Sequence, residues 1–369
     1  MRVVVCTIVH HPADARIYHR QIRALLEAGH QVTYIAPVGA EEFSAERTGP
    51  QLLLIAVPRA VGRRRLGALR AARRELARHT AGADLLLVHD PELLLALPPR
   101  RKRPPTIWDV HEDTAAALST KAWLPRPLRP AAAAAVHAAE RLAERRLHLI
   151  LAEQGYVERF SRPHPVVPNT TYVPEAVPPP DRPGAAQRVI YVGWLSPDRG
   201  VAEMIELGAL LRPHGVTVEL IGQADARARA LIEPAQAQGL LEWSGFVPND
   251  QAMRKVDGAL AGLSLLQDEA NFRHSMPTKV VEYMARGVPV VTTPLPAAAD
   301  LVTRYECGFV VPFGDPRAAA DAVLKLAADA SLRAKMGGRG HEAALTGMGW
   351  PADARAFVAQ LERWALARA

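Results

Sequence analysis

Apolar residues recur along the first half of the chain in short runs that alternate with amphipathic segments. The runs at residues 2–9, 31–36, 51–57, 84–88, 106–110 and 147–152 predict strands. Tyr18, Ile22, Leu25 and Leu26 predict a helix that ends at Gly29, and an alanine-rich helix is expected from about 130 to 146. Strands that alternate with helices favour a parallel sheet.

The same pattern starts again in the second half. Residues 163–183 are rich in proline and predict a linker rather than a regular element. Beyond it, strands are expected at 189–192, 217–221 and 258–266, with a helix at 202–211. Phe357, Leu361 and Trp364 have the spacing of one helix face, which needs a surface to cover. The sequence therefore predicts an α/β fold with two Rossmann-like parallel-sheet domains.

Composition adds few constraints. With 369 residues and 49% hydrophobic residues, the chain can form two cores. Cys6 and Cys307 lie far apart and suggest no disulfide framework, which fits a reducing cytoplasm. No apolar run approaches the length of a membrane span.

The segment from Ser275 to Val291 carries the sharpest chemical signal. Thr278 is expected to start a helix that stops at Gly287, and a buried strand follows. A helix start attracts phosphate, and Lys279 adds a full charge there. Glu282 could accept hydrogen bonds from the two hydroxyls of a ribose. The alternative is a surface pair of Lys279 and Glu282 without function.

This segment resembles the nucleotide-binding motif of the retaining GT-B glycosyltransferases of family 4, in the variant Pro-x-Lys-x-x-Glu-Tyr-Met. The matching residues are 277–284, and an Asn-containing loop from Asn271 precedes them. The resemblance implies a GT-B fold, in which two Rossmann-like domains face a central cleft. It implies an N-terminal acceptor-side domain at 1–165, a linker at 166–186, a nucleotide-sugar domain at 187–348, and a C-terminal helix at 349–369 packed back on the first domain.

The family also supplies roles for residues of the second half. Gly193, after a strand, and Arg199, before the next helix, look like its diphosphate-binding element, and Thr278 and Lys279 would complete that site. Trp194 stands where many relatives carry an arginine. Asn271, His274, Ser275 and Met276 are expected beside the donor sugar. His274 occupies the position of a common glutamate, which puts the identity of the sugar in question.

In the first half, His111 resembles the histidine that family members place over the donor sugar, so it is the candidate catalytic residue. Other polar residues follow strands and are expected as acceptor or loop contacts. They are His10, His11, Asp14, Arg16, His89, Asp90 and Glu153. A loop salt bridge between Asp14 and Arg16, a structural role for His111, and helix caps at Glu153 and Asp90 are the alternatives.

No metal site is suggested by the residue spacing, and no cofactor is expected beyond a nucleoside-diphosphate sugar as co-substrate, with a UDP-sugar as the guess. The net charge of +7 is clustered, notably in the arginines of residues 59–78. This basic segment is either a solvated helix or a peripheral contact with an anionic membrane, at the inner face in a cytoplasmic protein. Nucleic acid is not expected, because no aromatic residues interleave with the arginines.

The resulting hypothesis is a metal-independent retaining glycosyltransferase. It would move a hexosyl group from a nucleoside-diphosphate sugar to a hydroxyl of a glycan, a lipid-linked intermediate or a small molecule. A nucleotide-sugar epimerase of the same architecture and a non-catalytic nucleotide-sugar-binding subunit are the alternatives.

Overall fold

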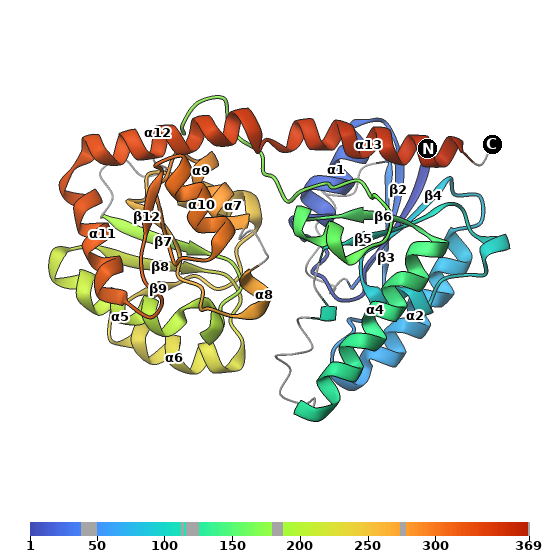
Figure 1. Cartoon of the computed structure of the whole chain (residues 1–369), viewed down its shortest axis with the longest axis horizontal. Helices are drawn as coiled ribbons and strands as arrows, with labels where there is room; N and C mark the ends of the chain where they lie inside the picture. The colour runs from blue at the N-terminus through green and yellow to red at the C-terminus, as the bar shows by residue number, and fades with distance from the viewer. Residues whose placement is uncertain (38–49, 112–113, 116–124, 179–186, 274–277, 368–369) are drawn as a thin grey trace. The chain divides into compact units, whose positions relative to one another are not determined.

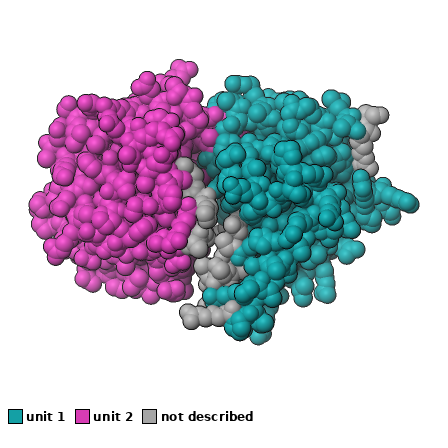
Figure 2. Space-filling model, viewed as in Figure 1, with its two compact units in different colours: residues 1–169, 351–369 teal, residues 170–350 magenta. Residues whose placement is uncertain are grey.

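A computed structural model describes residues 1–37, 50–111, 114–115, 125–178, 187–273 and 278–367. The chain forms two compact units (Figure 2). Unit 1 contains Met1–Asn169 and Pro351–Ala369, and unit 2 contains Thr170–Trp350. The terminal helix α13 (Trp350–Leu366) thus belongs almost wholly to unit 1, where Phe357 and Leu361 are fully buried.

Unit 1 is built on a six-stranded parallel sheet of order β3-β2-β1-β4-β5-β6 (Figure 1). Its strands are β1 (Arg2–Cys6), β2 (Gln31–Ala36), β3 (Leu52–Ala56), β4 (Leu85–Val88), β5 (Thr106–Val110) and β6 (His148–Leu151). The bounds of β2 and β5 are those predicted from the apolar runs. The other four strands are shorter than predicted because the runs continue into the loops that follow or precede them.

Helices of unit 1 follow the strands. Besides α13, those given bounds among the described residues are the π-helical segment η1 (Ile17–Ile22), α1 (Arg23–Glu27), α2 (Arg65–His79) and α4 (Arg129–Arg146). Single 3-10 turns are η3 (Gly62–Arg64), η4 (Pro91–Leu95), η5 (Arg100–Lys102), η6 (Arg126–Leu128) and η7 (Gln154–Arg159). Apolar residues at i, i+4 and i+8 of α2, namely Ala68, Ala72 and Leu76, pack on one face of the sheet.

Unit 2 repeats this arrangement, with a six-stranded parallel sheet of order β12-β11-β10-β7-β8-β9. Its strands are β7 (Arg188–Val192), β8 (Thr217–Ile221), β9 (Glu242–Trp243), β10 (Ala261–Ser264), β11 (Val290–Thr292) and β12 (Gly308–Val310). Read from β9, strands 3-2-1-4-5-6 lie side by side, the doubly wound order of a Rossmann domain. The fold prediction is confirmed.

Alternate residues of β7 explain why helices cover both faces of this sheet. Val189 and Tyr191 point to a core shared with α5 (Val201–Leu211), α6 (Ala226–Ala237) and α11 (Pro316–Ala328). Ile190 points to the opposite core. That core contains α7 (Asn249–Val256), α9 (Thr278–Ala285), α10 (Pro296–Arg304) and α12 (Ala330–Gly347). The remaining short elements are η8 (Pro197–Arg199), η9 (Arg212–His214) and α8 (Ala270–Arg273).

Doubly wound sheets bind ligands where the strand order reverses, at the carboxyl ends of the strands. In unit 1 this point lies between β1 and β4, and in unit 2 between β7 and β10. The loops after these strands therefore position the candidate residues of each unit.

Candidate active-site residues in the two units

A buried carboxylate, Asp109, is the centre of the polar cluster in unit 1. It is the single acidic residue of strand β5 and is fully buried. The Arg16 guanidinium donates to both of its carboxylate oxygens, at 2.6 and 2.7 Å, and Gln21 Nε2 donates at 3.1 Å. Arg16 also donates to Val167 O and Asn169 Oδ1, each at 2.9 Å. Arg16 therefore links the loop after β1 to strand β5 and to residues 167–169, which follow β6 in the chain.

The electrostatics of Asp109 follow from these contacts. Burial alone would raise the pKa of this carboxyl, but the charge and hydrogen bonds of Arg16 outweigh burial, with help from His111 and His89. The pKa of Asp109 therefore lies well below its ordinary value. Sequence analysis missed this residue, although one acid inside an otherwise apolar strand was the signal available.

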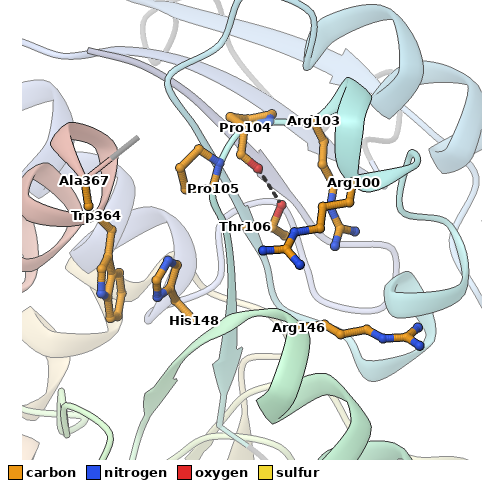
Figure 3. Close-up of a pocket in the computed structure, with 9 residues that line it drawn as sticks. All are labelled: Arg100, Arg103, Pro104, Pro105, Thr106, Arg146, His148, Trp364 and Ala367. Atoms are coloured by element: carbon orange, nitrogen blue, oxygen red, sulfur yellow. Dashed lines mark hydrogen bonds between the residues drawn. The ribbon is translucent and has the colours of Figure 1, made fainter. Parts of the chain in front are cut away.

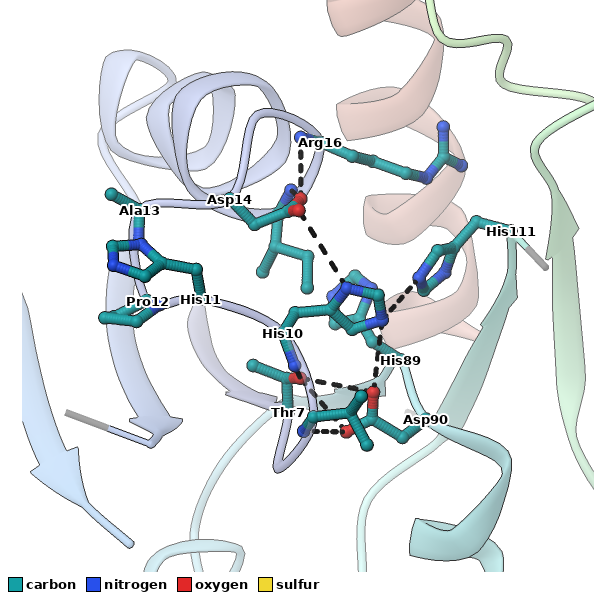
Figure 4. Close-up of polar contacts among 12 residues, drawn as sticks. Thr7, His10, His11, Pro12, Ala13, Asp14, Arg16, His89, Asp90 and His111 are labelled. Atoms are coloured by element: carbon teal, nitrogen blue, oxygen red, sulfur yellow. Dashed lines mark hydrogen bonds and ion pairs between the residues drawn. The ribbon is translucent and has the colours of Figure 1, made fainter. Parts of the chain in front are cut away.

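Three histidines from three loops, His10, His89 and His111, lie close together (Figure 4), and His89 and His111 also contact Asp109. His111 Nε2 lies 3.0 Å from His10 Nε2, and His111 Nδ1 lies 3.1 Å from the carbonyl oxygen of Asp109. His89 Nδ1 lies 3.1 Å from Asp109 Oδ2. Burial, with the nearby His111, lowers the pKa of His89, although Asp109 opposes this shift. The short contact between His10 and His111 requires one ring nitrogen to donate and the other to accept.

Asp90 holds the loop after β1 in place. Its carboxylate accepts hydrogen bonds from the Thr7 hydroxyl at 3.0 Å and from the backbone amides of Ile8 and Val9. His10 Nε2 lies 3.3 Å from Asp90 Oδ1. Asp90 also precedes the turn η4, so it lies at the predicted cap position, yet its carboxylate is directed to the first loop.

The loop salt bridge considered for Asp14 and Arg16 takes a different form. Asp14 Oδ1 accepts hydrogen bonds from the backbone amides of Arg16 and Ile17, at 2.8 and 3.0 Å, while the guanidinium pairs with Asp109. His10 Nδ1 is 3.9 Å from Asp14. Burial raises the pKa of Asp14, but His10 and these amides lower it by a larger amount. The net shift of this pKa is therefore downward.

Two of the predicted contacts lie outside this cluster. His11 Nδ1 accepts a hydrogen bond from the Ala13 amide, so it supports its own loop. Glu153 follows β6 and immediately precedes the turn η7.

The geometry of His89, Asp109 and His111 bears on the expectation of no metal. One ligand atom from each of these residues lies within 4.8 Å of the others, a grouping that sequence spacing did not reveal. However, the Arg16 guanidinium contacts both oxygens of Asp109. A cation placed there would face that positive charge and compete for the same oxygens, so the donor set does not fit a metal ion.

In unit 2, Lys279 is buried in the first turn of α9 with 5% of its surface exposed. Its Nζ lies 4.7 Å from the centre of the Tyr191 ring. Gly193 follows β7 with φ +138°, and a Cβ added there would lie 3.8 Å from Lys279 Nζ. Burial, together with the positive charge of Arg199, lowers the pKa of Lys279 to about 7, although Glu282 opposes this shift.

Arg199 and Glu282 complete the polar residues of this site. The Arg199 guanidinium lies 5.4 Å from the centre of the Phe272 ring. Glu282 is buried on α9 with 7% exposure, so the alternative of an exposed Lys279–Glu282 surface pair is wrong. Thr278 begins α9 as predicted. Trp194, which stands where many relatives carry an arginine, is 47% exposed.

Tyr283 fixes the loop that carries Gly193, a role that sequence analysis missed. Its hydroxyl accepts from the Val192 amide at 3.0 Å and donates to Leu263 O at 3.2 Å. Its ring lies on Gly262, where an added Cβ would come within 2.2 Å of ring atoms. Of the predicted sugar contacts, His274, Ser275 and Met276 lie outside the described residues, and Asn271 lies in α8.

Solved structures share this fold over nearly the whole chain. HepE from Anabaena, solved in complex with UDP-glucose, has a TM-score of 0.74 and 15% identity, covering 98% of this chain and 100% of that one. Sucrose-phosphate synthase from Thermosynechococcus elongatus has a TM-score of 0.71 and 18% identity, covering 100% and 99%. These similarities define the class of the fold, which is that of the GT-B glycosyltransferases.

Family models match both halves of the sequence. Residues 15–180 match the model described as Glycosyltransferase Family 4, and residues 175–343 match Glycosyl transferases group 1. The two matches together span residues 15–343, so both halves of the chain resemble glycosyltransferase domains, which supports the predicted enzyme class.

Curated relatives align over part of their length. WcaL of Salmonella typhimurium, described as a colanic acid biosynthesis glycosyltransferase, is 31% identical over 144 residues, which are 37% of this chain and 35% of WcaL. CapM of Staphylococcus aureus, a capsular polysaccharide biosynthesis glycosyltransferase, is 26% identical over 159 residues, 41% of this chain and 40% of CapM. The chain thus spans about a third to two fifths of these relatives.

Proposed function

We propose that unit 2 binds a nucleoside-diphosphate sugar and that the protein transfers the hexosyl group to an acceptor hydroxyl. The observation that carries this proposal is the buried Lys279, which lies beside the backbone turn at Gly193 and near enough to Arg199 for the two positive charges to interact. Burying a cation near a second cation is unfavourable, and a bound diphosphate removes that cost by supplying opposite charge. The UDP-glucose complex of HepE supports a uridine nucleotide as the donor.

Glu282 lies one turn beyond Lys279 on α9, where a ribose attached to that diphosphate would lie. Its carboxylate accepts hydrogen bonds from the ribose hydroxyls. By the family resemblance, Asn271, His274, Ser275 and Met276 contact the sugar, and His111 of unit 1 hydrogen-bonds one of its hydroxyls.

The reaction proposed from the resemblance retains the configuration of the sugar. The bond from the anomeric carbon to the diphosphate oxygen breaks, and a bond from that carbon to the acceptor oxygen forms on the same face. The acceptor proton moves to the leaving diphosphate oxygen. Lys279 and Arg199, with the helix start at Thr278, neutralise the charge of the departing diphosphate, so no metal ion is required.

Calorimetry with UDP, UMP and uridine tests the donor site. We expect Lys279→Met and Arg199→Gln each to weaken UDP binding about tenfold or more while changing uridine binding little, because both cations contact phosphate. Lys325→Met, at an exposed lysine on α11, is the matched control and should change neither. Equal losses for UDP and uridine would contradict the diphosphate assignment.

His111→Ala separates sugar chemistry from nucleotide binding. We expect kcat for transfer or donor hydrolysis to fall at least tenfold with UDP affinity within twofold, because the contact strengthens as charge develops on the sugar. An unchanged kcat would leave His111 a structural residue of the cluster around Asp109.

Product analysis distinguishes the classes of activity. Proton NMR of the product should show the anomeric configuration of the donor, and added chelator should leave the rate unchanged. Conversion of the donor sugar without an acceptor would indicate an epimerase instead. Binding without turnover across a panel of acceptors would indicate a nucleotide-sugar-binding subunit.

The names of WcaL and CapM favour a growing glycan or a lipid-linked intermediate as the acceptor.

No helix among the described residues is long and apolar enough to span a bilayer. We propose that the protein works in the cytoplasm and that the arginine-rich helix α2 contacts anionic lipid. Cosedimentation tests this: binding to anionic vesicles should exceed binding to neutral ones and decline with salt.

A further inference from the structure

A pocket of about 310 Å³ opens in unit 1 at the amino ends of strands β5 and β6 (Figure 3). Thr106, the first residue of β5, and His148, the first residue of β6, both line it. Parallel strands place their carboxyl ends at the other edge of the sheet, where the His10–His111 cluster lies. The pocket is thus separate from the candidate active-site residues of this unit.

Three arginines reach this pocket from two segments of the chain. Arg100 and Arg103 come from η5 and the residue after it, and Arg146 ends α4. None of the residues that line the pocket is acidic. Within the described parts of the chain, no carboxylate lies within ion-pair distance of Arg100 or Arg146. The positive charges of Arg100, Arg103 and Arg146 are therefore concentrated at one cavity whose lining contains no acidic residue.

The effect of this crowding is visible at Arg103. Partial burial lowers the pKa of its guanidinium, and the charges of Arg100 and Arg146 lower it further. All three side chains remain charged at neutral pH, because an arginine in a protein does not deprotonate. Their mutual repulsion is an energetic cost to the folded state that a bound anion would relieve.

The other wall of the pocket is flat and largely apolar. The rings of His148 and Trp364 stack with centres 4.6 Å apart and planes at 19°. Pro104 and Pro105 extend this surface. Burial and the nearby Arg162 lower the pKa of His148, so at neutral pH it does not add to the charge. A complementary ligand has an anionic end and a small uncharged organic group.

We propose that this pocket binds a phosphomonoester, with its phosphate among Arg100, Arg103 and Arg146 and its organic group against Trp364. Guanidinium groups pair with phosphate through parallel hydrogen bonds, and three of them more than neutralise the two negative charges of a phosphomonoester dianion. The cavity accommodates a phosphate with a few further atoms, which describes either a small free phosphate ester or an exposed lipid phosphate headgroup.

Calorimetry with glycerol 3-phosphate, and with glycerol as the uncharged control, tests the site in solution. The pocket variant is Arg100→Gln with Arg103→Gln and Arg146→Gln. The matched variant, Arg227→Gln with Arg304→Gln and Arg317→Gln on α6, α10 and α11, removes the same charge from exposed positions away from α2. We expect the pocket variant to lose at least tenfold in affinity and the matched variant less than twofold. Equal losses, or no binding to the unmodified protein, would overturn the proposal.

Vesicles distinguish the two sources of the phosphate. Phosphatidic acid presents a phosphomonoester, whereas phosphatidylglycerol presents a diester, and the two vesicle types are matched in surface potential. A preference for phosphatidic acid that disappears in the pocket variant alone supports the headgroup. Glycerol 3-phosphate binding without such a preference supports a free ester.

A milder pair of variants keeps the test decisive if the triple change disturbs folding. Ala367 is exposed and lines the pocket. Ala367→Asp places a carboxylate there, and Ala367→Asn has nearly the same shape without charge. The proposal requires Ala367→Asp to weaken glycerol 3-phosphate binding at least fivefold more than Ala367→Asn. UDP affinity should stay unchanged in every pocket variant, so this inference can fail while the donor-site proposal stands.

Discussion

Lys279 shows how its surroundings can change the ionisation of a single side chain. Its pKa of about 7 means that the ammonium is partly deprotonated near neutral pH. The unfolded chain, with the ordinary lysine pKa, holds this proton up to a much higher pH. The unfolded state therefore binds more protons than the folded state above pH 7, and this group makes stability rise with pH there.

A diphosphate bound beside Lys279 should restore its charge. We predict that UDP binding at pH 8 takes up about 0.5–1 proton from solution, because an adjacent anion raises the pKa of the ammonium. Calorimetry in buffers of different ionisation enthalpy measures this uptake. Lys279→Met should reduce it, and Lys325→Met should not. Uptake that is the same in all three proteins would place the diphosphate away from Lys279.

Arg16 is the residue on which the buried charge of Asp109 depends. Arg16→Met leaves that carboxylate without its main partner, and we expect a loss of about 3–5 kcal/mol in the free energy of unfolding. Arg23→Met is the control, because Arg23 forms an exposed pair with Glu27 at 3.5 Å that contributes about 0.5 kcal/mol or less. Denaturant titration of both variants measures these losses. An equal loss in the free energy of unfolding for the two variants would contradict the prediction.

The dependence of stability on acidic pH provides a second test of the Arg16–Asp109 pair. Because the pKa of Asp109 is depressed, its contribution is present above the ordinary carboxyl pKa and is lost as pH falls below it. Between pH 6 and pH 3, the unmodified protein should lose more stability than Arg16→Met does. A parallel decline in both proteins would mean that Asp109 keeps its ionisation without Arg16.

At the scale of elements, helix α9 joins the strands that carry the donor site. Tyr283→Phe removes the hydroxyl that bonds Val192 N and Leu263 O. We expect a loss of about 1–3 kcal/mol, since the Val192 amide is left without its partner, and UDP binding several-fold weaker. Tyr305→Phe, at a partly buried tyrosine of the same core, is the control. Thermal unfolding and UDP calorimetry provide the two readouts.

At the scale of the whole molecule, each unit has its own sheet and its own core. We predict two calorimetric unfolding transitions, because separate cores need not unfold together. By mass action, UDP should raise only the midpoint temperature of the unit 2 transition. Arg16→Met should lower only the midpoint temperature of the unit 1 transition. A single transition that responds to both changes would show that the two units unfold as one.

The order of apolar and polar residues was enough to predict most of the elements and the fold class. Strands β2 and β5 and the start of α9 have the predicted bounds, because a buried strand leaves a short apolar run and a helix start leaves local signals in the sequence. The motif around Lys279 and Glu282 was also recognisable, since its residues lie within one helix.

Only the tertiary structure decided which distant residues meet. Asp109 gains Arg16 from 93 residues away because β5 and the loop after β1 lie at the same edge of one sheet. The arginine pocket likewise requires η5, the end of α4 and the terminal helix to meet at the opposite edge. Such contacts leave no period in the sequence, because strand order, and not chain order, sets which loops are neighbours.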